Sequence, residues 1–170
     1  GIEESKFSIF LITVVDEVIP IVAINNMLTL IIEKECDFVS GTRYSLGGKR
    51  YGGSLLGSLL SRTANNLFRW ITGLVLTDAT TGFKMMRKSA WRQLSINSNP
   101  VGWAFAFELS IKAQLKGLKM GEVPVVSIDR LFGGESTFNF GTWTKEYLRW
   151  FFWGAARLNR FNRHQNKVVT

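Results

Sequence analysis

Residues 103–130 read WAFAFELSIKAQLKGLKMGEVPVVSIDR and place a helix, a helix stop and a strand in direct succession. Apolar residues recur at helical spacing from 103 to 116, and Gly117 follows them where a helix commonly ends. Three side chains of this helix are expected to face a core: Phe105, Leu109 and Ala113. Residues 118–130 predict a strand, in which Pro124 indicates an edge position or a bulge because proline cannot donate a ladder hydrogen bond.

The same alternation of helix and strand extends back to the N-terminus. Strands are expected over residues 7–15 and 36–44, helices over 25–35 and 55–71, a short helix near Ser89, and Gly-rich loops over 45–54 and 132–141. In the longest of these helices, the residues expected to face a core are Leu56, Leu59, Leu60, Leu67 and Trp70. The pattern predicts an α/β domain over residues 1–140, followed by a distinct segment over 141–170.

Residues 7–32 are almost continuously apolar and long enough to cross a bilayer. However, Asp16 and Glu17 lie in the middle of this run, and two carboxylates at mid-bilayer would cost several kcal/mol. The run is therefore predicted to be a strand followed by a helix, rather than a membrane span.

The composition excludes several classes of protein. The chain has 170 residues, of which 46% are apolar and 20% are charged, so it is neither a disordered tail nor a low-complexity linker. One cysteine, Cys36, and one histidine, His164, exclude a disulfide scaffold and a zinc finger. Since His164 lies in a polar tail, no Ser-His-Asp or Cys-His catalytic site is expected.

The net charge of +8 is unevenly distributed. Residues 1–40 carry a net charge of −5, whereas residues 41–170 carry +13. A basic body of this kind favours a polyanionic partner: nucleic acid, an anionic lipid surface or a phosphorylated ligand. A solvated basic surface is the alternative. The arginines and tryptophans form no known nucleic-acid-binding pattern, which disfavours nucleic acid.

The C-terminal segment combines bulky apolar side chains with positive charge. Residues 141–170 hold six bases and one acid. The apolar side chains are Trp143, Tyr147, Trp150, Phe151, Trp153, Leu158 and Phe161. This composition is typical of an amphipathic helix that lies in a membrane interface. A helix docked on the protein's own core is the alternative.

Several bases stand near the expected strand ends and Gly-rich loops, where a phosphate-binding site needs them. They are Arg43 at the end of one strand, Arg62 beside Ser61 on the next helix, Lys84 and Arg130. Arginine can bind phosphate through two parallel hydrogen bonds. The stretch GTRYSLGGKR over 41–50 is not a P-loop, because Arg43 replaces its first glycine and Arg50 its Ser or Thr.

The motif DATTGFK, over residues 78–84, allows two interpretations. In the local one, the Asp78 carboxylate caps the turn and Gly82 adopts a positive φ. In the functional one, the backbone of the motif and Thr81 lie near a ligand. Two further acids, Glu108 and Glu122, are predicted to be structural.

Taken together, the motifs resemble the family-2 glycosyltransferases, and within them the dolichol-phosphate mannosyltransferase-like, polyprenyl-phosphate type. The matching stretches are CDFVSGTRY (36–44), SRTANNLFRWITGL (61–74), DATTGFK (78–84), residues 102–130 and GGES (133–136). The resemblance implies a partial GT-A, Rossmann-like fold, a nucleotide-sugar donor, a divalent metal (Mg²⁺ or Mn²⁺) and a polyprenyl-phosphate acceptor at the cytoplasmic face of a membrane.

The resemblance also implies roles for individual residues. Arg43 and Ser61 would hold the acceptor phosphate, while Arg130 and Ser136 would belong to a loop that closes over the donor phosphates. The family's metal-binding Asp-x-Asp reads Asp16-Glu17-Val18 here, which leaves Asp16 as the candidate metal ligand and catalytic residue with Arg43.

Two further positions depart from the family pattern, since Gly57 replaces a base and Thr137 replaces a lysine. Nothing in the chain matches the usual N-terminal nucleotide-binding half. The chain is therefore expected to be the C-terminal part of a hexosyltransferase, or a hexosyltransferase chain whose first forty residues have diverged. The resemblance implies direct displacement by the lipid phosphate, which is already a nucleophile at pH 7 because its second pKa is near 6. The alternative is a non-catalytic module that binds lipid phosphate at a membrane surface.

Overall fold

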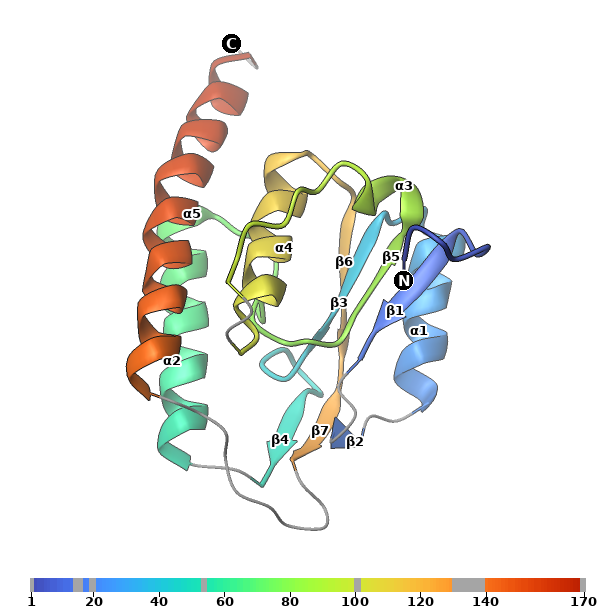
Figure 1. Ribbon diagram of the computed structural model, residues 1–170, viewed down its shortest axis with the longest axis horizontal. Coiled ribbons are helices and arrows are strands. Elements are labelled where there is room, and N and C mark those ends of the chain that lie inside the picture. Colours follow the sequence, from blue (N-terminus) through green and yellow to red (C-terminus); the bar gives the residue numbers. More distant parts are fainter. Residues whose placement is uncertain are drawn as a thin grey trace.

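The computed structural model describes residues 2–13, 17–18, 21–52, 55–99, 102–129 and 140–168. Its elements in chain order are β1 (Ile9–Ile12), β2 (Glu17–Val18), α1 (Ile21–Ile32), β3 (Phe38–Thr42), β4 (Lys49–Tyr51), α2 (Leu55–Thr72), β5 (Lys84–Arg87), α3 (Lys88–Trp91), α4 (Ala104–Leu115), β6 (Met120–Pro124), β7 (Val126–Asp129) and α5 (Phe140–Val168) (Figure 1). The predicted α/β class is confirmed.

The strands form two small sheets. The first has the order β1-β5-β3-β6, in which β5 is antiparallel to both neighbours and β3 is parallel to β6. The second has the order β2-β7-β4. Pro124 ends the edge strand β6, and Val125 separates it from β7 in the other sheet. Of the two expectations for this proline, the edge position is thus confirmed, and the edge strand β6 ends at it.

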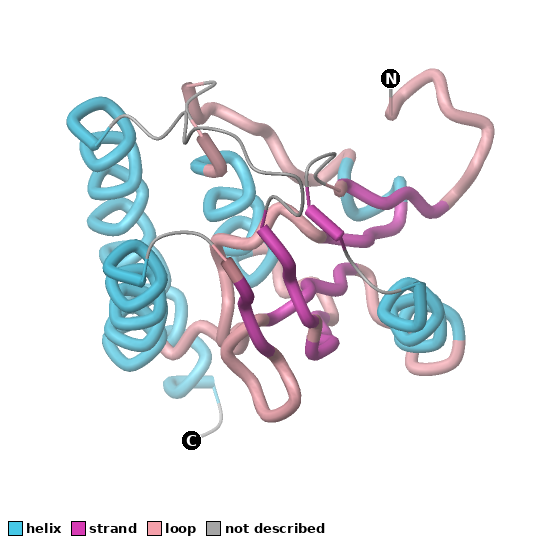
Figure 2. The backbone as a smooth tube through the Cα atoms, turned by 90° about the horizontal axis from the view of Figure 1, so that it is seen from below, coloured by secondary structure: helices cyan, strands magenta, loops and turns pink. Residues whose placement is uncertain are grey.

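Helices cover both faces of the first sheet (Figures 1 and 2). Alternate residues of the paired strands β3 and β5 supply the two cores, as the pleat requires. Val39 and Met85 pack with α1, whereas Phe38 and Met86 pack in the cluster that includes residues of α4 and α5. The helix α4 is buried along most of its length, and Gly117 ends it with a φ of 66°, as expected.

The C-terminal helix α5 packs against α2 and α4. Trp150 and Leu158, two of the side chains expected at a membrane interface, are buried in the core shared with α4. Gly154 allows close contact, since a Cβ there would lie 2.7 Å from Ile111 Cδ1. The structure therefore docks this helix on the protein's own core. No helix in the described ranges is both long and apolar enough to cross a membrane.

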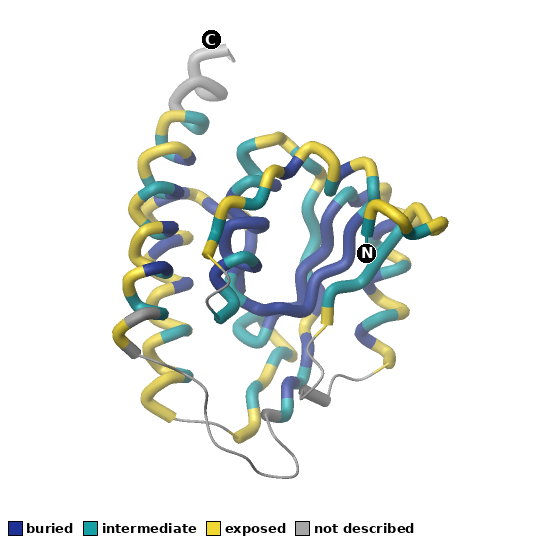
Figure 3. The backbone as a smooth tube through the Cα atoms, viewed as in Figure 1, coloured by how far each residue is buried: buried dark blue, intermediate teal, exposed yellow. Residues whose placement is uncertain are grey.

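The predicted orientation of α2 is wrong. Its bounds agree with the sequence, but the leucines and the tryptophan expected in a core are exposed, as the outer surface of this helix shows (Figure 3). The residues that α2 buries are Asn65, Phe68 and Thr72. A prediction from hydrophobicity alone selects the opposite face of the helix. The structure buries the polar side chains Asn65 and Thr72 because both form hydrogen bonds inside the protein.

Other boundaries shift modestly. β1 is shorter than the expected strand over 7–15, and Phe7 is exposed. α1 begins at Ile21, four residues before its predicted start. The expected loop over 45–54 contains β4, which pairs in parallel with β7. The loop expected over 132–141 falls largely outside the described residues.

Candidate functional site

The candidate site lies where β3 ends and meets the segment over residues 77–83. Thr42, the last residue of β3, places its Oγ1 2.6 Å from Thr77 Oγ1. The next residue, Arg43, donates from its backbone N–H and its side chain to Asp78. These contacts connect two motifs that are 35 residues apart in the sequence.

Arg43 and Asp78 form a two-pronged ion pair. Arg43 Nε lies 2.7 Å from Asp78 Oδ2, and Nη2 lies 3.0 Å from Oδ1. The Asp78 side chain is fully buried, so desolvation raises its pKa, but the charge and hydrogen bonds of Arg43 outweigh burial and the pKa is lowered. Asp78 is thus ionised at neutral pH and fixes the plane of the guanidinium.

Two polar side chains hold the backbone of residues 77–79 in place. Glu122 Oε1 on β6 accepts hydrogen bonds from Thr77 N at 2.6 Å and Asp78 N at 3.2 Å. Asn65 Oδ1 on α2 accepts from Ala79 N at 2.8 Å. Glu122 is therefore structural, as predicted. Glu108 is structural as well, because its two carboxylate oxygens accept from the backbone at 97 and 98.

Hydroxyl groups surround the ion pair. Thr80 Oγ1 accepts from Asn65 Nδ2 at 3.1 Å and donates to Asp78 Oδ1 at 3.2 Å. Tyr44 Oη donates to Ser61 Oγ at 2.8 Å, and the Arg43 guanidinium carbon lies 5.1 Å from the Tyr44 ring centroid. The structure thus brings three predicted site residues, Arg43, Ser61 and Asp78, into one cluster.

Three members of this cluster were not predicted as site residues: Tyr44, Asn65 and Thr80. The sequence carried a signal for one of them, because Asn65 follows Ser61 by four residues and lies on the same helical face. Thr80 and Tyr44 depend on contacts between distant segments, which spacing does not show.

Lys84 lies beneath the cluster rather than at its surface. Its side chain is fully buried, and Nζ donates to Ser40 Oγ at 3.0 Å. Burial lowers the pKa of Lys84 to about 7, against the opposing charges of Asp78 and Glu122. Direct contact with a phosphate, as predicted from the sequence, would require its neighbours to move. In this arrangement Lys84 supports the loop from below.

The remaining predicted residues divide into two groups. Thr81 is buried and accepts a hydrogen bond from Phe83 N, and Arg62 is exposed on α2. Asp16, Arg130 and Ser136 lie outside the described residues, so their placement stays a prediction.

Within the described part of the chain, no three His, Cys, Asp or Glu residues are grouped to hold a metal. The candidate metal ligand, Asp16, is not among the residues of this part.

Gly82 does not adopt the predicted positive φ. Its role is steric, since a Cβ at this position would lie 2.5 Å from Trp103 Cζ3 and 2.6 Å from Cε3. The tryptophan ring lies directly against the backbone of the motif and fixes how α4 approaches it.

Gly82→Ala is therefore expected to destabilise the protein by about 1–3 kcal/mol, because the added methyl group must displace the Trp103 ring. Urea denaturation would measure this change. Gly57→Ala, at an exposed position inside α2, is the control and should stabilise by up to about 1 kcal/mol. Equal urea concentrations at the midpoint of unfolding for Gly82→Ala and the wild type would contradict the steric role of Gly82.

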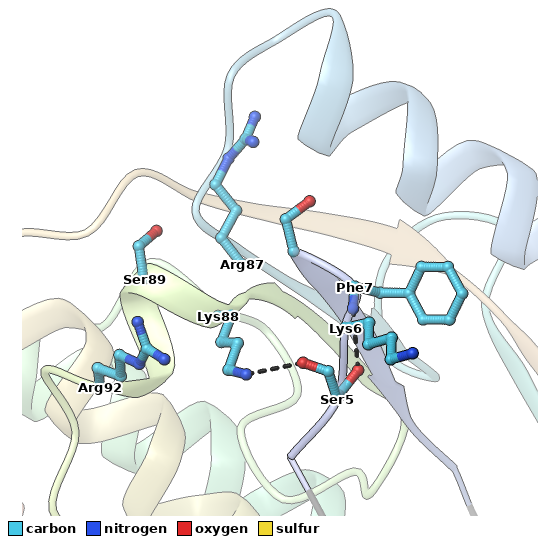
Figure 4. A pocket seen from close by; sticks show the side chains of 8 residues that line it. Ser5, Lys6, Phe7, Arg87, Lys88, Ser89 and Arg92 are labelled. Carbon is cyan, nitrogen blue, oxygen red and sulfur yellow. Dashed lines mark hydrogen bonds between the residues drawn. The ribbon is translucent and has the colours of Figure 1, made fainter. Parts of the chain in front are cut away.

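A second hollow lies apart from this cluster, between the N-terminal residues and the α3 region (Figure 4). It has a volume of about 350 Å³ and is rich in bases. Three of these bases bind protein groups. Lys88 Nζ donates to the carbonyl oxygens of Glu3 and Ser5, Arg87 donates to the carbonyl oxygens of Ile31 and Cys36, and Arg92 pairs with the Glu3 carboxylate at 3.2 Å. This hollow therefore adds nothing to the Arg43 cluster.

Comparison with known proteins identifies the class. The structure aligns with glucosyl-3-phosphoglycerate synthase from Mycobacterium tuberculosis in complex with Mn²⁺, UDP-glucose and phosphoglyceric acid. The TM-score is 0.61 at 14% identity, and the alignment covers 91% of this chain and 52% of the other. The complex of that protein with Mg²⁺ and UDP aligns equally well, with a TM-score of 0.61. The fold is thus that of a GT-A glycosyltransferase.

Sequence relatives narrow the class. The chain is 26% identical over 103 residues to polyprenol monophosphomannose synthase of Mycolicibacterium smegmatis, covering 60% of this chain and 39% of that protein. It is also 26% identical over 124 residues to undecaprenyl-phosphate mannosyltransferase of Micrococcus luteus, covering 72% and 51%. No family profile matches. The resemblance to polyprenyl-phosphate mannosyltransferases is confirmed, and the chain spans between about two fifths and half of these relatives.

Proposed function

We propose that this chain forms the acceptor-binding part of a glycosyltransferase that moves a hexose, of mannose or glucose type, from a nucleotide sugar to a polyprenyl or dolichyl phosphate at the cytoplasmic face of a membrane. The observation that carries the proposal is the Arg43–Asp78 pair, with the Ser61 and Thr80 hydroxyls beside it. The named activities of the two sequence relatives support it.

Arg43 acts by binding and orienting the acceptor phosphate. A guanidinium has five N–H donors in one plane, and the bonds to Asp78 fix that plane before the ligand arrives. Ser61, held by Tyr44, adds a hydroxyl that can donate to a phosphate oxygen. A phosphate monoester with a second pKa near 6 is ionised at pH 7, so no side chain has to remove a proton.

We also propose a divalent metal, Mg²⁺ or Mn²⁺, as the cofactor that neutralises the leaving nucleotide diphosphate. The support is that the aligned glucosyl-3-phosphoglycerate synthase was solved with these ions. Asp16 is the candidate ligand in this chain, and Arg130 and Ser136 are the candidates for the donor phosphates. These assignments rest on the sequence resemblance.

The assay is transfer from a panel of nucleotide sugars to polyprenyl phosphate, with the natural protein as the enzyme. Sugar-labelled lipid phosphate would support the proposal. Acceptor binding without transfer from any donor would instead support the non-catalytic, lipid-phosphate-binding module.

Ser61→Ala is expected to weaken binding of a short-chain isoprenyl phosphate by about five- to tenfold, because one hydrogen bond to the ligand is lost. Isothermal titration would measure the dissociation constant. Ser58→Ala, one turn earlier on α2, is the matched control and should bind like the wild type. If both variants bind equally well, Ser61 does not contact the acceptor.

A further inference from the structure

The Lys84 ammonium is buried beneath the Arg43 cluster with little to bind it. Among the described residues, its only hydrogen bond is the one from Nζ to Ser40 Oγ, at 3.0 Å. Nζ also lies 5.4 Å from the centroid of the Phe38 ring. Within the described ranges, no carboxylate lies close enough to form an ion pair with it. An ammonium has three N–H donors, so this one is poorly satisfied for a buried charge.

Burial of this ammonium opposes folding. Desolvation lowers the pKa of Lys84 to about 7 and outweighs the attraction of Asp78 and Glu122. A charge that is buried without an ion-pair partner destabilises the folded state relative to an apolar side chain of similar length. Methionine at this position would therefore suit the fold better, which indicates that the lysine serves the site above it rather than stability.

The charges that act on Lys84 belong to the candidate site. They are the carboxylates of Asp78 and Glu122 and the guanidinium of Arg43. Glu108, the buried acid of α4, instead binds the backbone at 97 and 98. The neighbours on the flanking strands are uncharged: Ser40 and Phe38 on β3, and Ile12, the Cα partner of Lys84, on β1. Without the ammonium, two carboxylates would face a single guanidinium.

We propose that Lys84 is a positioning residue for acceptor binding, whose ammonium balances the Asp78 and Glu122 carboxylates so that Arg43 keeps its attraction for a phosphate. With Lys84 protonated, the four groups carry no net charge. With Lys84 neutral, they carry one negative charge and repel a phosphate dianion. Lys84 acts through Arg43 and Asp78, without touching the ligand, and burial shields its effect from salt. The inference rests on the proposed function, because it concerns the same acceptor site.

Lys84→Met removes the ammonium and keeps the approximate length of the side chain. At about pH 6.5, where wild-type Lys84 is mostly protonated, the variant should bind a short-chain isoprenyl phosphate on the order of tenfold more weakly. Between about pH 6.5 and 8.5, the wild type should lose about the same factor as Lys84 deprotonates, whereas the variant should change little. The ligand does not cause this loss, since its second pKa is near 6. Isothermal titration would measure the dissociation constants.

The stability of the same variant separates positioning from a structural role. Lys84→Met should unfold at the same urea concentration as the wild type or at a higher one, because a buried charge without an ion-pair partner is gone. A structural role would instead lower both stability and affinity. Lys116→Met is the matched control, since it makes the same change at an exposed lysine at the end of α4. It should keep the wild-type affinity and pH profile.

Four results would overturn the role of Lys84 while leaving the acceptor site intact. They are equal acceptor affinity of Lys84→Met and the wild type at about pH 6.5, a wild-type affinity that does not fall as the pH rises, an equal loss in Lys116→Met, and a Lys84→Met protein that is less stable than the wild type. A wild-type protein that does not bind the isoprenyl phosphate at either pH would refute the acceptor site itself, and this role with it.

Discussion

Arg43→Ala is expected to weaken binding of the acceptor phosphate by about 100-fold or more, the cost typical of removing one member of a buried, charge-assisted pair. Binding of the donor should change far less. The reason is geometric: Asp78 holds the guanidinium by two bonds of 2.7 and 3.0 Å, so the ligand meets a rigid group. Titration of the protein with a short-chain isoprenyl phosphate, and separately with a nucleotide sugar, would measure the two affinities.

The alanine variant also leaves Asp78 buried without its partner, which can unfold the protein. Arg43→Lys avoids this, because it keeps the charge and loses the two-pronged geometry. We expect it to remain folded and to bind the acceptor about tenfold more weakly. Arg62→Ala, at an exposed neighbouring base, measures the effect of general charge loss. An equal loss of donor and acceptor affinity in Arg43→Lys would contradict the assigned role.

Asp78→Asn is expected to destabilise the protein by about 3–5 kcal/mol, because Arg43 would remain without its buried counter-charge. Chemical denaturation followed by tryptophan fluorescence would measure this. Glu3→Gln is the matched control: it makes the same carboxylate-to-amide change in the Arg92 pair, where the Glu3 side chain is 57% exposed. That change should cost less than about 1 kcal/mol.

The contribution of Asp78 also depends on pH. Its folded-state pKa lies below the ordinary 3.8, so the unfolded chain binds the proton first as the pH falls. The stabilisation is therefore complete above about pH 4 and is lost as the pH falls through the lowered value. The difference in the free energy of unfolding between wild type and Asp78→Asn should become smaller only at acidic pH. A difference that disappears near pH 7 would show that another group controls the pair.

Much of the fold follows from local signals. The helix over Ala104–Leu115 and its end at Gly117 depend on apolar spacing and one left-handed residue, both visible in the sequence. The orientation of α2 does not follow from local signals. Seven of its apolar residues face outward and only one, Phe68, is buried, so apolar periodicity predicts the wrong face. Periodicity identifies an apolar face but does not say whether protein or another apolar medium covers it.

The candidate site was predictable only in part. The motifs supplied Arg43, Ser61 and Asp78, whereas the support from Asn65 and Glu122 depends on tertiary contacts. Lys84, in contrast, was predicted to contact a phosphate, but the structure buries it. A base in a phosphate-binding motif suggests a ligand contact, but the strand alternation of β5 turns this side chain inward, where Ser40 and two carboxylates surround it.

The hold of Glu122 on the backbone at Thr77 and Asp78 has a consequence for synthesis on the ribosome. These partners are 45 and 44 residues apart, and Glu122 reaches them from β6, which pairs with β3 across about 80 residues of chain. The loop over residues 77–79 therefore gains its fixed shape only after β6 has been translated and added to the sheet edge. A nascent chain that ends before this strand would expose the loop without its anchor, so the proposed acceptor site would form only late in synthesis.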